Sequence, residues 1–224
     1  MAAMKDTLKE KFAAKFPGVA AEVKTLIKEH GNFVLGQYTV EQVYQGMKGM
    51  TGMITETSKL DSEIGIKFRG YSIPELREKL PKAPGGTEPL PEGIFYLMLL
   101  GELPTTQDVV ELSNNWARRS NVPKHVFDII DKMPANAHPM TQFSAAIIAL
   151  QTESLFYSAY RKGISKKDYW DYMYEDSMNL ISRLPRIAAY IYRRTYHNGV
   201  HIEPDHTLDW AANFAHMLGF EQFD

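Results

Sequence analysis

The part of the chain that decides the fold is residues 166–196, which read KKDYWDYMYEDSMNLISRLPRIAAYIYRRTY. Side chains of one face recur with a period near 3.6, which predicts one long helix. An interior proline removes a hydrogen bond and costs about 3 kcal/mol, so we expect Pro185 to kink this helix rather than end it. The repeating positions are Tyr169, Met173, Asp176, Leu180, Leu184, Ala188, Ile191 and Tyr192.

Helical patterns also dominate the rest of the chain from Ser72 onward. Residues 72–75 form a capping box, and Thr105 and Pro123 stand at two further helix starts. The almost wholly apolar run 91–100 predicts a fully buried helix that ends at Gly101. The last helix is expected from Leu208 to Met217, with Gly219 as its end.

Another helix is expected over residues 138–154, beginning at His138-Pro139. Its alanines, Ala145, Ala146 and Ala149, would let a second helix approach closely. The expected buried face consists of Met140, Phe143, Ala146, Ile147 and Leu150.

The first third of the chain is less regular. A helical face ends at Pro17-Gly18, and a second one begins at Val19 and ends at His30-Gly31. Residues 33–72 carry six glycines and short β-branched or aromatic patches, which predicts loops with short strands or a small hairpin. The sequence therefore predicts a mainly α protein with a small glycine-rich, β-containing segment near the N-terminus.

Composition excludes several classes of protein. The 224 residues are 44% hydrophobic, enough for a sizeable core, and 25 basic residues against 27 acidic ones give no reason to expect nucleic acid as a partner. With no cysteine, the chain has neither a disulfide framework nor a thiolate site. The longest charge-free run, 133–152, contains two prolines and polar residues in its first half, so no membrane span is expected.

Histidine is the first candidate for chemistry. His197, His201 and His206 lie within ten residues, next to Glu203 and Asp205, but Gly199 and Pro204 break any helix that would align them. We therefore interpret this segment as a solvated loop rather than a metal site. His138 stands at a helix start, where a structural cap is favoured over a catalytic base.

Two segments are candidates for binding an anion. The loop 46–52 contains three glycines and Lys48, although it lacks the Gly-Lys-Ser/Thr ending of a phosphate-binding loop. The basic cluster Arg161, Lys162, Lys166 and Lys167 is either a solvated face or a phosphate contact. The neighbouring carboxylates Glu175 and Asp176 point about 100° apart on a helix, so they form no convergent acid/base pair. From the residues alone, no complete active site is visible.

Short sequence motifs distributed along the chain carry a family resemblance. They are EHG at 29–31, GMKGM at 46–50, LD at 60–61, GIKFRGYSIP at 65–74, EPLPEG at 88–93, HPMTQ at 138–142, YED at 174–176 and MLG at 217–219. Together they resemble the amino-terminal half of eukaryotic, mitochondrial-type citrate synthases, over about residues 8–220. The resemblance implies the mainly helical large domain of that family, with residues 1–224 as its amino-terminal part and the small domain and carboxyl-terminal half outside this chain.

The family condenses acetyl-CoA with oxaloacetate and needs no metal or other cofactor. Its catalytic aspartate and histidines lie in the other half, so the resemblance assigns no catalytic residue here and predicts that this chain is inactive alone. It does imply contacts to CoA phosphates through Lys48 and Lys166, at positions where the family usually has arginine. Lysine keeps the positive charge but lacks the paired N–H donors with which an arginine binds a phosphate through two hydrogen bonds, so weaker phosphate binding is expected.

The resemblance also implies a partner and a location. We expect a two-fold homodimer through helices 138–154 and 166–196, with acetyl-CoA and oxaloacetate as substrates of the complete protein and neither nucleic acid nor membrane as partner. We expect the mitochondrial matrix, with the presequence absent from this chain, and a peroxisomal location stays open. Two alternatives remain: a non-catalytic structural or dimerisation module, and part of a 2-methylcitrate synthase.

Overall fold

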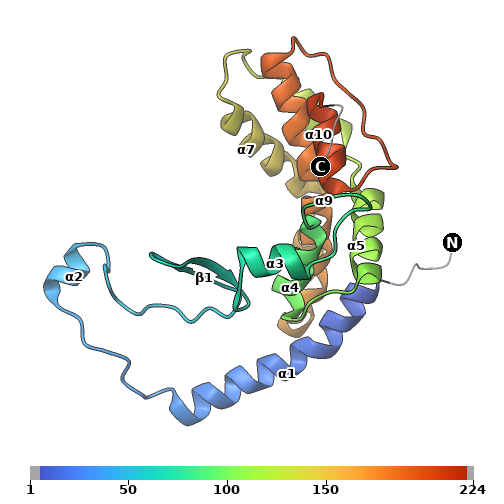
Figure 1. Ribbon diagram of the computed structural model, residues 1–224. Helices are drawn as coiled ribbons and strands as arrows, with labels where there is room; N and C mark the ends of the chain where they lie inside the picture. The colour runs from blue at the N-terminus through green and yellow to red at the C-terminus, as the bar shows by residue number, and fades with distance from the viewer. Residues whose placement is uncertain (1–5, 221–224) are drawn as a thin grey trace. The chain divides into compact units, whose positions relative to one another are not determined.

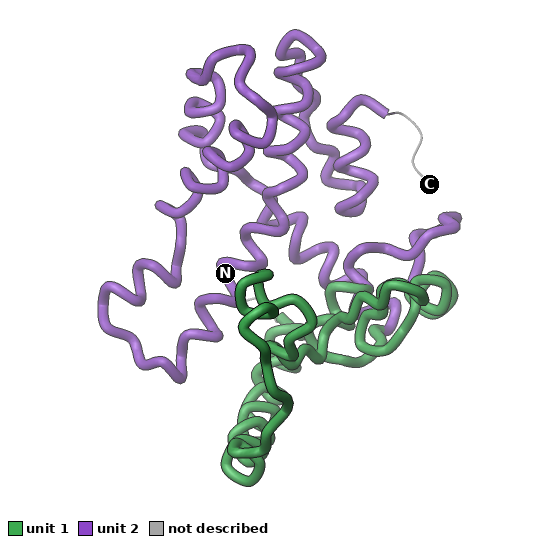
Figure 2. Tube along the Cα trace, turned by 90° about the vertical axis from the view of Figure 1, so that its left-hand side faces the viewer, with its two compact units in different colours: residues 1–80, 94–104 green, residues 81–93, 105–224 purple. Residues whose placement is uncertain are grey.

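The computed structural model describes residues 6–220 and divides into two compact units, shown in different colours in Figure 2. Unit 1 comprises residues 1–80 and 94–104, and unit 2 comprises residues 81–93 and 105–224. The predicted mainly α fold class is confirmed, because helices account for most of the labelled elements in Figure 1. Within residues 6–220, every helix is too short or too polar to span a bilayer.

Unit 1 begins with one long helix where two were predicted. Helix α1 runs from Thr7 to His30 with Pro17 inside it, and the Asp6 carboxylate caps its start by accepting from the Lys9 amide at 3.1 Å. The prediction that Pro17-Gly18 ends the helix is wrong. A proline costs one hydrogen bond, and the residues after Gly18 include the good helix formers Ala, Glu, Lys and Leu, which continue the helix.

The remaining elements of unit 1 include the predicted hairpin. Strands β1 and β2 are antiparallel with Ser58 opposite Phe68, and β2 pairs with β3. A short helix, α2, was not predicted; a capping box between Thr39 and Gln42 begins it. The elements are α2 (Val40–Tyr44), β1 (Ser58–Asp61), β2 (Gly65–Phe68), β3 (Tyr71–Ser72), α3 (Ile73–Lys79) and the greater part of α4 (Pro91–Leu100).

Unit 1 has a small core next to its sheet. Leu76, Leu80 and Leu97 are buried and pack against residues of β2, β3 and α4. The Arg69 guanidinium, at the end of β2, donates to the Met98 carbonyl from Nε at 3.2 Å and from Nη2 at 2.9 Å. α1 is tied to α4 by the Lys11 ammonium, which donates to the Tyr96 hydroxyl at 2.8 Å.

Unit 2 is helical throughout its main elements. The helix start predicted at Thr105 is confirmed and proves to be a capping box with Asp108. The helix start at Pro123 and the end of the last helix at Gly219, which has φ of 107°, are confirmed as well. The elements are α5 (Thr106–Arg119), α6 (Lys124–Lys132), α7 (Pro139–Ala149), the 3-10 helices η1 (Leu150–Glu153) and η2 (Lys166–Asp168), α8 (Leu155–Arg161), α9 (Tyr169–Tyr196) and α10 (Trp210–Leu218).

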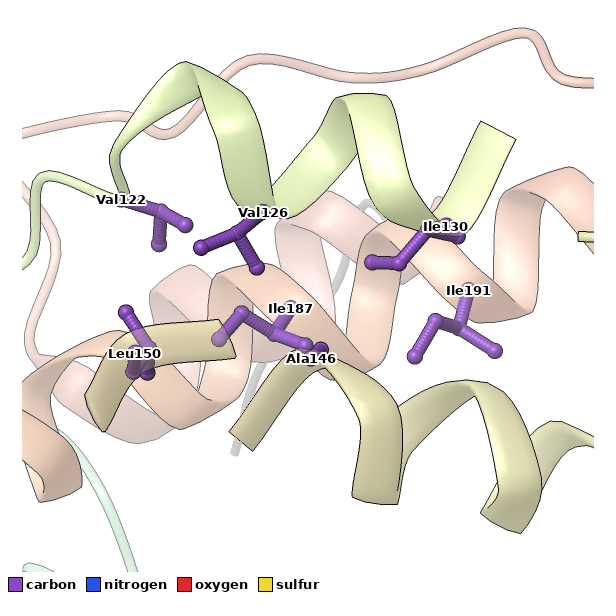
Figure 3. Packing of buried hydrophobic residues seen from close by; sticks show 7 residues of the cluster. All are labelled: Val122, Val126, Ile130, Ala146, Leu150, Ile187 and Ile191. Atoms are coloured by element: carbon purple, nitrogen blue, oxygen red, sulfur yellow. The ribbon is translucent and has the colours of Figure 1, made fainter. Parts of the chain in front are cut away.

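Helices α6, α7 and α9 enclose the main core of unit 2. Figure 3 shows seven side chains from these helices and their adjoining residues pointing toward one another. Ala146 is fully buried here, so the predicted close approach of a second helix is made by α6 and α9 of the same chain. The cluster consists of Val122, Val126, Ile130, Ala146, Leu150, Ile187 and Ile191.

Two details of the predicted 138–154 helix are wrong. The α-helix ends at Ala149, and the chain continues as the 3-10 helix η1. Met140 is 60% exposed, whereas Gln142, one turn before Ala146, is fully buried. The buried amide is tolerated because it is satisfied: its Nε2 donates to the Ala137 carbonyl at 2.8 Å and its Oε1 accepts from Arg194 at 2.9 Å.

Candidate functional site

Lys48 lies in a tight turn that follows α2 in unit 1. Gly46, Met47 and Gly49 all have positive φ, between 65° and 74°, and the Lys48 side chain is exposed. Three amides around it are already used within the turn, because Gly46, Met47 and Met50 donate to backbone carbonyls. The turn thus presents one lysine ammonium to an anion, with fewer backbone donors than a phosphate-binding loop offers.

Lys166 begins the 3-10 helix η2 in unit 2 and is also exposed, like its neighbours Arg161, Lys162 and Lys167. The Arg161 guanidinium lies over the Tyr157 ring at 5.8 Å. Lys48 belongs to unit 1 and Lys166 to unit 2.

The three clustered histidines lie in the segment that joins α9 to α10. His201 stacks on Tyr190, His197 lies near Tyr192 with 5.0 Å between ring centroids, and His206 is exposed. Their rings are thus engaged differently rather than converging. Among residues 6–220, no three His, Asp or Glu side chains gather closely enough to hold a metal ion.

His138 takes the structural role that the sequence favours. Its Nδ1 accepts a hydrogen bond from the Met140 amide at 3.2 Å, which caps the start of α7. The ring therefore satisfies one of the amide donors that every helix start leaves unpaired. The predicted cap at His138 is confirmed.

Glu175 and Asp176 point to different neighbours, as their adjacent helical positions predict. Glu175 accepts from the Arg119 guanidinium at 2.7 Å, which ties α9 to α5. Asp176 accepts from the Ser154 hydroxyl at 2.6 Å and from the amides of Leu155 at 2.8 Å and Phe156 at 3.1 Å, so it holds the start of α8. Both carboxylates join helices of unit 2.

A buried acid that sequence reasoning missed is Glu92, in the first turn of α4. Its side chain is fully buried, and neither carboxylate oxygen has a donor in hydrogen-bonding geometry among the described residues. Burial raises the pKa of Glu92, and the nearby Asp209 carboxylate adds to this effect. The backbone amide of Glu92, the Ser113 hydroxyl and the Trp210 amide oppose it, although none of them meets the geometry of a hydrogen bond. The only sequence signal is a charge inside an otherwise apolar run.

The comparisons with known proteins identify the family. The family model described as "Citrate synthase, C-terminal domain" matches residues 46–224, which is most of the chain. The chain therefore belongs to the citrate synthase family, as the motifs at 46–50, 65–74 and 138–142 indicated. That description does not decide which half of a complete protein this chain forms, and the amino-terminal assignment stays a prediction.

Curated relatives and a solved structure agree with the family. The chain is 52% identical to "Citrate synthase, mitochondrial" of Aspergillus niger and 51% identical to "2-methylcitrate synthase, mitochondrial" of Yarrowia lipolytica, each over 96% of this chain and 45–46% of the relative. The citrate synthase of Pyrobaculum aerophilum superposes with a TM-score of 0.66 at 25% identity, over 80% of this chain and 43% of that one. The chain spans about half the length of the curated relatives it matches.

Proposed function

We propose that this chain forms the amino-terminal, helical half of a citrate synthase, the enzyme that condenses acetyl-CoA with oxaloacetate and water to citrate and CoA. The observation that carries this proposal is the 52% identity to a mitochondrial citrate synthase over 96% of the chain. The family's chemistry needs no metal or other cofactor, and the described residues of this chain serve mainly as a scaffold.

The contribution of this chain to substrate binding rests on Lys48 in unit 1 and Lys166 in unit 2. Each offers an exposed ammonium to a CoA phosphate, and a contact of that kind contributes about 0–1 kcal/mol. Neither residue can move a proton during the condensation, and the buried Glu92 has no described opening to a substrate. We therefore expect the 224-residue chain alone to show no turnover.

The experiment is fragment complementation. The purified chain is incubated with acetyl-CoA and oxaloacetate, alone and together with the carboxyl-terminal half of the Aspergillus niger relative, and release of the CoA thiol is followed. We expect a rate only in the mixture. Turnover by the chain alone would overturn the proposed division of labour, whereas no turnover in a mixture that forms a complex would support the non-catalytic alternative.

A 2-methylcitrate synthase is the second candidate, because the Yarrowia lipolytica relative of that name is 51% identical over 96% of the chain. Identity alone does not separate the two activities, since the identities of the two relatives to this chain, 51% and 52%, differ by one percentage point. A comparison of acetyl-CoA with propionyl-CoA turnover by the complemented enzyme separates them. We expect the acetyl-CoA rate to be the larger.

We further propose a homodimer through helices 138–154 and 166–196, located in the mitochondrial matrix. An exposed apolar face on α7 supports the interface, with Met140 60% and Ile148 74% exposed, and the mitochondrial relatives support the location. Of the alanines expected at the interface, Ala146 is already used inside the chain, so Ile148 is the better probe. Ile148→Glu is expected to shift sedimentation toward the monomer, and an unchanged dimer would contradict this interface.

A further inference from the structure

The segment that joins α9 to α10, residues 197–209, is fastened to the helices beneath it by a small number of contacts, and we call it the strap. The Arg193 Nε donates to the Val200 carbonyl at 2.7 Å, and Arg186 pairs with Glu203 at 2.8 Å. Both arginines belong to α9. Between these two fastenings lies His201, whose ring contacts the Tyr190 side chain of α9.

His201 stacks face to face on Tyr190 of α9. The ring centroids are 3.7 Å apart and the planes differ by 6°. Tyr190 is itself fixed, because its hydroxyl donates to the two carboxylate oxygens of Asp131 at 2.9 and 2.8 Å, and its ring lies 4.5 Å from that of Phe127. The imidazole therefore rests on a platform that α6 and α9 build together.

The protonation state of His201 matters because of its Nδ1. This atom is buried and has no hydrogen-bond partner among the described residues. The neutral ring leaves only an unused acceptor there, whereas the charged ring would bury an N–H without an acceptor. The charged ring would gain cation–π attraction from Tyr190, but it would lose the hydrogen bond to water that Nδ1–H makes when the strap is open.

Charged groups of both signs surround this stack, which borders a surface hollow of about 250 Å³. Burial lowers the pKa of His201 and Arg193 adds to the decrease, while Asp131 and Glu203 oppose it. From α10 only the apolar Met217 lines the hollow among the described residues. The charged side chains lining it are Lys124, Asp128 and Asp131 from α6, Arg186 and Arg193 from α9, and Glu203 from the strap; Arg194 of α9 lies 4.0 Å from Asp131.

We propose that residues 197–209 form an acid-released strap, held on Tyr190 while His201 is neutral and detached from α9 when His201 takes up a proton at Nδ1. The direction of the pH effect follows from the linkage between protonation of His201 and closure of the strap. Since the pKa of His201 is lower in the closed state than in the open one, closure is favoured above the open-state pKa and is lost as pH falls toward the closed-state pKa. Between these limits each fall of one pH unit increases the ratio of open to closed strap by up to about tenfold.

The test is a proton-NMR titration of the full 224-residue chain with ¹³C-labelled histidine, in which comparison with His201→Gln assigns the His201 signals. The stack predicts ring-current-shifted His201 signals at pH 8, an apparent pKa of His201 below the ordinary histidine value of 6.5, and loss of the ring-current shift on protonation. Amide hydrogen exchange of residues 198–203, corrected for the intrinsic pH dependence, is expected to become faster over the same pH range.

Two variants make the result specific. His201→Phe keeps an aromatic ring on Tyr190 but cannot take a proton, so the pH-dependent opening of the strap is expected to disappear. His206→Gln removes a histidine of the same strap that makes no stack and is expected to leave the opening unchanged. Ring-current shifts that persist in the protonated His201, or acid opening that survives in His201→Phe, would overturn the proposal.

Discussion

The core between α6, α7 and α9 and the segment 33–57 of unit 1 contain similar apolar side chains in opposite environments. Ile187 is fully buried in the first, and Ile54 is 76% exposed in the second. Each core helix has apolar residues at every third or fourth position and therefore one apolar face, and the apolar faces of the three helices pack against one another. The segment 33–57 is interrupted by glycines and contains one short helix, so its apolar residues share no face within the described chain.

The comparison shows that apolar composition alone does not bury a side chain. A regular element must first satisfy the backbone and present several apolar residues on one side. The exposed residues of the segment include Phe33, Val34, Leu35, Met53 and Ile54. An exposed apolar run of this length is typical of a surface that another part of an assembly covers, which agrees with the proposal that this chain is half of a larger enzyme.

The largest expected change in stability comes from replacing isoleucine by alanine in each of the two regions. Ile187→Ala removes atoms from a closed core and is expected to lower the free energy of unfolding by about 2–5 kcal/mol. Ile54→Ala, at the exposed position, is expected to change it by less than about 0.5 kcal/mol. Urea denaturation followed by circular dichroism measures both, and equal losses would contradict the contrast.

A smaller effect is expected at the junction of α8 and α9. Asp176→Ala removes three hydrogen bonds from a carboxylate to the start of α8, and we expect a loss of about 2 kcal/mol. Asp168→Ala is the matched control, because Asp168 stands before α9 without making a capping bond from its side chain. If the two variants lose the same stability, Asp176 does not act through these bonds.

Local signals allowed much of the fold to be predicted from the sequence. The capping boxes at Ser72 and Thr105, the cap at His138 and the terminal Gly219 all act within one turn of a helix, so the sequence contains the whole interaction. The prediction at Pro17 was wrong because the outcome there depends on more than one turn of the helix. Whether a proline ends a helix depends on the competing stability of the residues on both sides, and a turn signal alone does not measure that balance.

The chemistry of the candidate residues was harder to predict, because it depends on contacts between distant segments. Tyr190 of α9 bonds to Asp131 of α6 and stacks on His201 of the strap. The spacing of these three residues in the sequence does not predict that they meet. Gln142 shows the same limit, since a polar residue is expected at the surface unless its partner, here Arg194, is known. Family motifs supplied the identity that the residues alone did not.

Glu92 provides a pH-dependent prediction for unit 2. Because burial raises its pKa in the folded chain, the unfolded chain ionises first as pH rises above about 4.5, the ordinary value for Glu. The stability that the protonated Glu92 contributes at low pH is therefore lost as pH rises toward its folded-state pKa. Glu92→Gln keeps the shape without the titration, so wild-type stability minus variant stability should fall between pH 4 and pH 8 in urea titrations. A difference that stays constant or rises would show that Glu92 is not held protonated.

The smallest expected effect concerns Lys48, in the exposed region itself. Lys48→Ala is expected to change the free energy of unfolding by less than about 0.5 kcal/mol, since the side chain is exposed. In the complemented enzyme it is expected to weaken CoA binding by at most about 1 kcal/mol, about fivefold, because one exposed charge contacts a phosphate.

Lys48→Arg sharpens that test, because a guanidinium can bind a phosphate with two hydrogen bonds and is expected to tighten CoA binding. Lys59→Ala removes another exposed lysine of unit 1, on β1, and serves as the matched control. Calorimetric titration with CoA and with pantetheine, which lacks the phosphates, separates a phosphate contact from a general effect of charge. If Lys48→Ala weakens both ligands equally, or no more than Lys59→Ala does, then Lys48 makes no phosphate contact and the CoA assignment in unit 1 fails.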